Sequence, residues 1–157
     1  MSNTAKWIAG AGQGLTWGAA FGTEINSLAA GSVAVSGVVI ANGTPLDLYA
    51  DVSFALTGTT PASGAAYFAL YLLALNQDAS TYGDGTASGA VPPGGNYLVA
   101  SVQVPLSKTS AVLTGIARGI ILPPGSFKFA IANQTGNALA ASGNAIEYRT
   151  YNENLNG

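Results

Sequence analysis

The sequence contains no histidine and no cysteine, and only five basic and seven acidic residues occur among its 157 positions. Enzymes draw mostly on His, Cys, Asp, Glu and Lys, because these groups exchange protons near neutral pH or act as nucleophiles. Without imidazole or thiolate, the chain cannot build a Ser–His or Cys–His pair, nor offer nitrogen or sulfur ligands to zinc. We therefore expect no enzymatic activity, no cofactor and no bound metal.

The scarcity of charge also limits the kinds of partner. Charged residues make up 8% of the chain, about a third of the usual quarter. Much of the surface must then be uncharged polar or apolar, and such surfaces associate, so assembly into a larger particle is expected. The net charge of −2 and the lack of a basic patch argue against a nucleic-acid partner. The missing cysteines exclude a disulfide framework.

Long hydrophobic runs are absent as well. The longest strongly apolar run, residues 65–75, has eleven residues, whereas a membrane-spanning helix needs about 20. Residues 1–14 carry one lysine and no continuous hydrophobic core, so they do not resemble a secretory signal. We expect a soluble protein with no membrane partner.

What the chain does contain is glycine, small apolar residues and strand-like alternation. In residues 48–56, apolar side chains occupy every second position, and Asp51 and Ser53 lie between them. This period of two predicts a half-buried strand with Asp51 on its solvated face. Residues 65–75 are apolar almost throughout, so a helix is an alternative on composition, but their aromatic content favours a strand buried on both faces.

Further strands follow from the same reasoning. They are expected at residues 32–40, with a bulge or bend at Gly37, and at residues 97–104, 112–122, 126–132, 138–141 and 145–151. About eight strands with no helix between them predict an all-β fold, a single antiparallel β-sandwich or barrel, and a jelly roll is the natural eight-strand solution. We assign this domain to residues 25–157.

Residues 1–24 stand apart as an extended N-terminal arm. Five glycines after position 9 disfavour a helix, and Trp7 and Trp17 are the only tryptophans in the chain. One interpretation is that both tryptophans cap the core of their own domain. The alternative is that they anchor the arm on a neighbouring subunit, as buried aromatic residues do at interfaces. Both are candidate partner contacts.

The loop at residues 76–96 is the other candidate contact region, because loops of this length in compact domains are usually functional or disordered. Asp78 and Asp84 could supply oxygen ligands to calcium. The spacing of an EF-hand is absent, however, and Asp and Gly are ordinary turn formers. Tyr82 and Asp84 are therefore named as candidate contacts with a partner, with no metal assigned.

Acidic pairs and tyrosines offer little chemistry by themselves. A glycosidase needs two carboxylates about 5 to 10 Å apart, and Asp51 and Glu147 both occupy outward strand positions where solvation explains them. Strand tyrosines could form a platform for a sugar, although packing within the sandwich is their more common role. A carbohydrate-binding or hydrolytic β-sandwich stays open as the weakest alternative.

Several segments together resemble the cement, or decoration, proteins of tailed bacteriophages. The segments are residues 21–29, 46–52, 75–78, 82–85, 121–129, 140–144 and 148–152. They span nearly the whole chain, and none of them is a chemical signature.

The resemblance implies a jelly-roll subunit on the outside of the capsid. In virions assembled in the host cytoplasm, such a protein bridges neighbouring major capsid proteins and forms dimers or trimers. A tail, baseplate or fibre module of a phage, with loops that bind a receptor, is the alternative within virion proteins.

Overall fold

The computed structural model describes residues 6–58, 66–104 and 112–154. The sequence also predicts turns at residues 60–64 and 107–110, and these lie outside the described residues. The elements are β1 (Lys6–Ala9), β2 (Gly18–Ala19), β3 (Val33–Val35), β4 (Ile40–Ala41), β5 (Tyr49–Thr57), β6 (Tyr67–Ala74), the 3-10 turn η1 (Gly95–Tyr97), β7 (Leu98–Gln103), β8 (Val112–Ile121), β9 (Ser126–Gln134) and β10 (Ala145–Asn154). No α-helix occurs among the described residues, and none of their helical segments is long and apolar enough to cross a bilayer.

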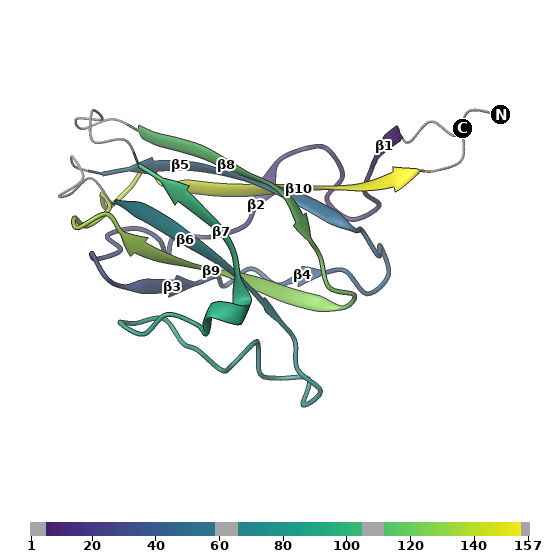
Figure 1. Ribbon diagram of the computed structural model, residues 1–157, viewed down its shortest axis with the longest axis horizontal. Coiled ribbons are helices and arrows are strands. Elements are labelled where there is room, and N and C mark those ends of the chain that lie inside the picture. Colours follow the sequence, from purple (N-terminus) through teal and green to yellow (C-terminus); the bar gives the residue numbers. More distant parts are fainter. Residues whose placement is uncertain (1–5, 59–65, 105–111, 155–157) are drawn as a thin grey trace.

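The strands form two antiparallel sheets that pack face to face (Figure 1). Sheet A has the order β1-β10-β5-β8, and β2 also pairs with β10. Sheet B has the order β3-β9-β6-β7, and β4 also pairs with β9. The prediction of an all-β antiparallel sandwich is confirmed.

The chain passes repeatedly from one sheet to the other, and its strand pairs are nested. The innermost pair is β6 with β7, and β5 with β8 encloses it. Next, β3 and β4 pair with β9, while β1 and β2 pair with β10 at the outside of the series. The first and last described strands, β1 and β10, therefore lie side by side in sheet A.

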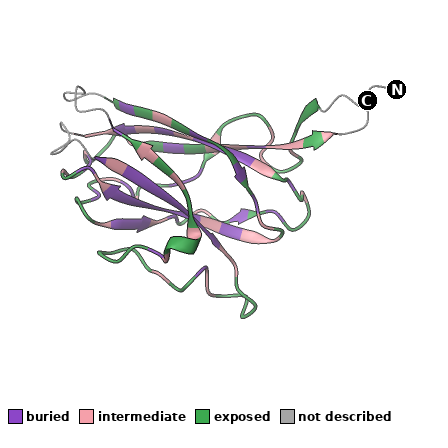
Figure 2. Ribbon diagram, in the orientation of Figure 1, coloured by how far each residue is buried: buried purple, intermediate pink, exposed green. Residues whose placement is uncertain are grey.

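The core fills the space between the sheets. Alternate residues of β5 and β9 point into it, and four phenylalanines, Phe54, Phe68, Phe127 and Phe129, are its largest fully buried side chains. In Figure 2 the buried residues gather on the strands of both sheets, whereas β1 is exposed throughout. The alternation predicted in residues 48–56 and 126–132 thus gives the correct inward face except at Leu48, which precedes β5 and is 49% exposed.

Sheet B is also covered on its outer face. A second apolar cluster lies there, made of Val33, Ala69, Tyr71, Leu73, Ala130 and Ala132. The loop at residues 76–96 covers this cluster: Tyr82 packs against it, and Gly89 forms an antiparallel bridge with Val33. The prediction that the strand in residues 65–75 is buried on both faces is confirmed, since β6 is buried from Phe68 to Leu73.

Two predicted strands differ in the structure. The segment 32–40 forms two short strands, β3 and β4, because the chain bends at Gly37, as predicted. Ser36 N–H still donates to Phe129 O of β9 (2.9 Å), but Gly37 N–H donates to Glu24 Oε1 (2.6 Å) instead of to a strand. Residues 138–141 are not a strand, and there the prediction is wrong. Leu139 N–H donates to Leu28 O, whereas Ala140 N–H donates to Thr57 O. Because these acceptors belong to different segments, no ladder forms.

Residues 6–24 lie against their own domain. β1 and β2 pair with β10, and the backbone between them is held by two buried side chains. Asp47 accepts hydrogen bonds from Ala11 N–H (2.7 Å) and Gly12 N–H (3.0 Å), and Thr150 Oγ1 accepts one from Gly14 N–H (3.0 Å). The segment forms an edge of sheet A, and a contact with a neighbouring subunit stays a prediction.

Candidate binding surface

The outer face of sheet A carries both tryptophans and both arginines of the chain. Since β5 turns Ala50, Val52, Phe54 and Leu56 into the core, its intervening residues Tyr49, Asp51 and Ser53 face outward. The register of β10 against β5 places Arg149 opposite Asp51 and Tyr151 opposite Tyr49. Residues that are 100 positions apart in sequence therefore form one group.

A β-bulge in β8 completes this group. Its pairing with β5 shifts between Ala50 and Val52, where Arg118 and Gly119 stand opposite Asp51. Gly119 has a φ of 66°, the left-handed conformation that glycine adopts at such bulges. The extra residue lets β8 turn Ala117 and Ile120 inward on either side, while Arg118 points outward and stays exposed.

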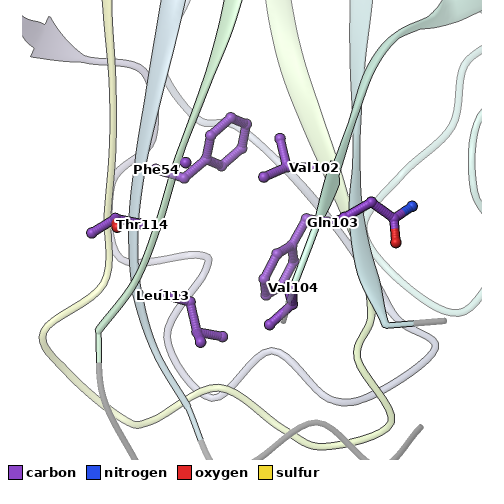
Figure 3. A pocket seen from close by; sticks show the side chains of 8 residues that line it. Phe54, Val102, Gln103, Val104, Leu113 and Thr114 are labelled. Atoms are coloured by element: carbon purple, nitrogen blue, oxygen red, sulfur yellow. The ribbon is translucent and has the colours of Figure 1, made fainter. Parts of the chain in front are cut away.

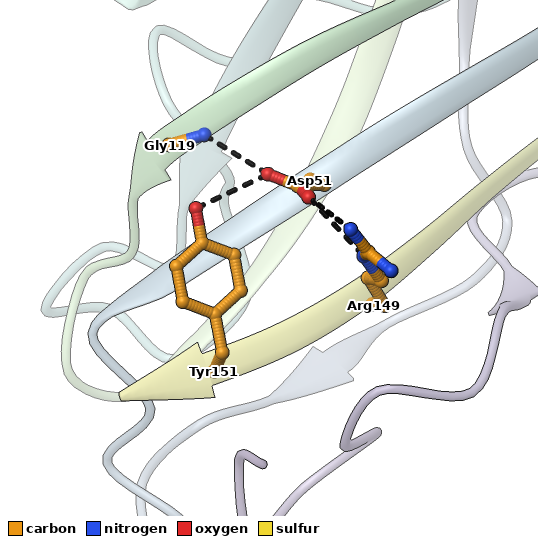
Figure 4. Close-up of polar contacts among 4 residues, drawn as sticks. All are labelled: Asp51, Gly119, Arg149 and Tyr151. Atoms are coloured by element: carbon orange, nitrogen blue, oxygen red, sulfur yellow. Dashed lines mark hydrogen bonds and ion pairs between the residues drawn. The ribbon is translucent and has the colours of Figure 1, made fainter. Parts of the chain in front are cut away.

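Asp51 is the centre of a saturated hydrogen-bond network (Figure 4). Its Oδ1 accepts from Gly119 N–H and from Tyr151 O–H, both at 3.1 Å. Its Oδ2 accepts from Arg149 Nε (3.1 Å) and Nη2 (2.8 Å), which makes an ion pair. A carboxylate has about four lone-pair sites, so these four hydrogen bonds occupy the acceptor sites of Asp51.

The network corrects the expectation that Asp51 is solvated. The residue is only 3% exposed, because Arg149 and Tyr151 lie over it. Burial by itself would raise the pKa of the Asp51 carboxyl, but the hydrogen bonds from Arg149, Gly119 and Tyr151 outweigh it and hold the pKa below its usual value. Burial, with the adjacent Asp51 charge, raises the pKa of the Tyr151 hydroxyl.

Aromatic rings gather beside this network. Trp7 lies edge-on to Tyr49 and to Tyr151, at centroid distances of 5.8 and 5.1 Å, and the two tyrosine rings stack at 5.6 Å. The Arg149 guanidinium lies over the Trp17 ring at 4.9 Å. Both tryptophans are thus brought to the same face of sheet A, although ten residues separate them.

An open pocket of about 400 Å³ lies between these groups, lined by Trp7, Leu15, Asp51, Arg118, Arg149 and Tyr151. Pockets for small ligands or anchoring side chains fall in the range of about 300–1,000 Å³. Within the described part of the chain, no hydrogen bond or ion pair involves the Arg118 guanidinium. The pocket therefore places the Arg118 guanidinium, which has no hydrogen-bond or ion-pair partner in the described chain, next to exposed aromatic and aliphatic side chains.

The other two predicted contact residues lie on the opposite sheet. Tyr82 is half-buried against the outer cluster of sheet B, with Lys128 Nζ 4.8 Å from its ring centroid. Asp84 is exposed, but both of its carboxylate oxygens already accept hydrogen bonds. Oδ1 accepts from the N–H and hydroxyl groups of Thr86, and Oδ2 accepts from Gly94 N–H at 2.8 Å. Those hydrogen bonds, led by that of the Thr86 side chain, lower the pKa of the Asp84 carboxyl. Both residues shape the loop.

Asp78 has a similar local role. Its Oδ1 accepts from Ser80 N–H (3.0 Å) and Thr81 N–H (2.8 Å). The hydrogen bond from the Thr81 side chain, with these backbone bonds, lowers the pKa of Asp78 to about 2. Among the residues that the structure describes, no three His, Cys, Asp or Glu side chains come close enough to hold a metal ion.

A smaller apolar cavity of about 60 Å³ opens between the free edges of the sheets, at β7 and β8 (Figure 3). Phe54, Val102, Val104 and Leu113 line it. It is far below the size of a ligand site, and a Cβ on nearby Gly115 would lie 2.5 Å from Val102 Cγ1. We regard it as a packing gap.

Sequence reasoning named Trp7 and Trp17 but not the residues that join them. Arg118 of β8 cannot be linked to Arg149 and Tyr151 of β10 from the sequence, because these two strands are distant in the chain and both pair with β5. The alternation of residues 145–151 gave one signal, since it places Arg149 and Tyr151 on one face. Comparison of the chain with protein-family models, with curated proteins and with solved structures finds no match.

Proposed function

We propose that this chain is a structural subunit of a tailed bacteriophage. In this proposal it is a capsid cement protein that binds the outer surface of the head and bridges neighbouring major capsid proteins. The proposal rests on the resemblance of its segments to that class and on the character of one face of the sandwich. It includes no reaction, in keeping with the saturated hydrogen bonds of Asp51.

The observation that carries the proposal is the contrast between the two outer faces. Sheet B is covered by the chain's own loop at residues 76–96. Sheet A has no comparable cover among the described residues, and its Trp7 and Ile121 are 66% and 76% exposed. Exposed apolar groups within a polar rim mark protein–protein contact sites. Sheet A is therefore the face that we assign to the capsid.

The strand order supports a finer description of the fold. If β1 with β2 and β3 with β4 each count as one strand, eight strands pair as first with eighth, second with seventh, third with sixth and fourth with fifth. This nesting is the winding of a jelly roll, and we infer that the chain belongs to this architecture.

The mechanism would be mechanical. Each copy buries a modest area on two adjacent capsid proteins, and the gain exists only where these proteins are assembled. Binding to the assembled state alone stabilises that state by mass action, roughly 2.7 kcal/mol per site when the free protein is at a hundred times its Kd. Summed over many copies, such contacts resist internal DNA pressure. Dimers or trimers of the subunit would extend the bridge, with no nucleic acid or membrane involved.

Particles that lack this protein provide the test. We expect them to release DNA at a lower temperature than complete particles while keeping their tails, and purified protein should restore heat resistance. Ile121→Glu should fail to restore it, because this exposed position lies on the face of sheet A. Val91→Glu is the matched control: Val91 is 73% exposed but belongs to the loop that covers sheet B.

Other results would overturn the proposal. Unchanged heat resistance in particles without the protein, together with lost adsorption to host cells, would assign the chain to the tail, baseplate or fibre. The grouping of Trp7, Tyr49 and Tyr151 beside two arginines favours a receptor-binding module as this second candidate.

A further inference from the structure

Positive charge is unevenly distributed over this acidic chain. The sequence holds five basic residues against seven acidic ones, yet Arg118 and Arg149 line the same pocket on sheet A. Lys128 lies on the opposite sheet, over Tyr82. With Asp51 as the one acid in the pocket lining, two guanidiniums and one carboxylate give the lining a charge of +1 in a molecule whose net charge is −2. Glu147 and Glu153 also lie on β10, but outside this lining.

The two arginines differ in how many of their N–H donors already have hydrogen-bond partners. A guanidinium has five N–H donors, and Arg149 gives Nε and Nη2 to Asp51. Arg118 gives none within the described chain. An unpaired guanidinium in a pocket walled by Trp7 and Tyr151 matches the planar geometry of an incoming carboxylate.

We propose that this pocket binds a carboxylate side chain, an aspartate or glutamate flanked by an apolar residue, presented by an extended segment of a partner protein. Arg118 pairs with the carboxylate, and the exposed ring of Trp7 and the side chain of Leu15 pack against the apolar flank. This inference rests on the proposed function only in taking the partner to be a protein.

The surroundings favour a protein segment over an acidic sugar. Leu15 lies in the pocket lining, and Ile116 and Ile121 project from β8 on the same face, all of them exposed. Aliphatic side chains offer a sugar no hydrogen bonds, whereas they bury well against Leu, Ile or Val of a peptide. Trp, Tyr and Arg are also the residues that dominate binding energy at protein interfaces.

The chain provides its own spectroscopic probe, because its only tryptophans are Trp7 and Trp17. The substitution Trp17→Phe leaves Trp7 as the sole tryptophan and keeps an aromatic ring under Arg149. We would titrate this protein with the capped tripeptides acetyl-Leu-Glu-Leu-amide and acetyl-Leu-Gln-Leu-amide and follow Trp7 fluorescence. The two peptides differ only in the charge of the central side chain.

We expect saturable binding of the glutamate peptide, with a Kd on the order of 1 mM, and roughly tenfold weaker binding of the glutamine peptide. Arg118→Gln should abolish this preference. Lys128→Gln, which removes a cation from the opposite sheet, should preserve it. Circular dichroism would establish that each variant keeps the fold of the parent protein.

Three outcomes would overturn the inference. These are no saturable binding of the glutamate peptide, a preference for it that survives Arg118→Gln, and tighter binding of a galacturonic acid trisaccharide than of the glutamate peptide. The proposed function is tested separately with the particles. If Arg118→Gln protein restores heat resistance as well as the wild type does, the proposed carboxylate site is contradicted and the cement role is not. If the peptides bind as expected but the purified protein does not restore heat resistance to the particles, the cement role is contradicted and the carboxylate site is not.

Discussion

At the scale of single residues, Asp51 shows how neighbours determine the state of a side chain. It occupies an outward strand position, where a carboxylate is ordinarily hydrated. In this sheet, however, Arg149 and Tyr151 from β10 and the bulged backbone of β8 replace the water with four hydrogen bonds. A buried carboxylate is tolerable only when such donors are present.

The substitution Asp51→Asn should destabilise the protein by about 2 kcal/mol at pH 7. The amide cannot accept at its nitrogen, so it opposes a donor there and leaves the Arg149 charge without its partner. The free energy of unfolding in urea would measure this loss. Glu147→Gln, on an exposed position of the neighbouring strand β10, should change stability by less than about 0.5 kcal/mol.

The substitution Asp51→Asn should also alter how the free energy of unfolding depends on pH. The pKa of Asp51 in the folded protein lies below its ordinary value, so its ionised form is favoured by folding. That contribution is complete above the unfolded pKa and is lost as the pH falls through the folded pKa. Between pH 5 and pH 2, the wild type should therefore lose stability more steeply than Asp51→Asn. Equal slopes would contradict the network described for Asp51.

At the scale of elements, the bulge of β8 determines which of its side chains face the core and which, like Arg118, face the pocket. Without the extra residue, the alternation of β8 would continue past Ala117 and place Arg118 and Ile120 on one face. Only Gly119, with its positive φ, lets both Ala117 and Ile120 reach the core. Nothing in the run of residues 112–122 marks this bulge except the glycine itself.

Gly119→Ala should cost roughly 1–2 kcal/mol, the strain of a side chain in the left-handed region. Space is not the cause, since the nearest atom to a Cβ there is Tyr151 Oη at 3.9 Å. Gly95→Ala is the matched control, because Gly95 has open space around it without a positive φ. Thermal unfolding of both variants would separate them, and equal melting temperatures would contradict a strained bulge.

The loop at residues 76–96 explains another element-scale result. Residues 65–75 lack alternation because β6 is covered on one side by the core and on the other by this loop. The sequence therefore predicted double burial correctly without indicating what covers the second face. By contrast, Leu139 satisfies the apolar pattern of residues 138–141 by packing in the core, with no strand required.

At the scale of the whole molecule, the N-terminal segment closes one edge of sheet A. Residues 10–14 matter more than β1, because they supply the donors that satisfy buried Asp47 and Thr150. A Cβ on Gly10 would lie 2.4 Å from Asp47 Oδ2 and from Thr150 Oγ1. The glycines of this segment allow that close approach.

Two truncations should therefore differ. Removal of residues 1–9 deletes exposed β1 and should lower stability by about 1 kcal/mol, whereas removal of residues 1–16 should cost about 3 kcal/mol or more, because it leaves a buried carboxylate without its backbone donors. Urea unfolding would measure both. Truncations that match the wild type would contradict this anchoring. A melting temperature that rises with protein concentration would favour an arm placed on a neighbouring subunit.

The sequence by itself determined the class of fold. A period of two, frequent glycine and the absence of helical periodicity leave only a sandwich or barrel of strands, because local alternation alone specifies which side chains are buried. Tertiary structure decided what the outer faces contain. Arg118, Arg149, Trp7 and Asp51 meet only because the first and last strands pair and β8 is bulged. Pairing between distant strands has no local signal, so the pocket could not be located from the chain alone.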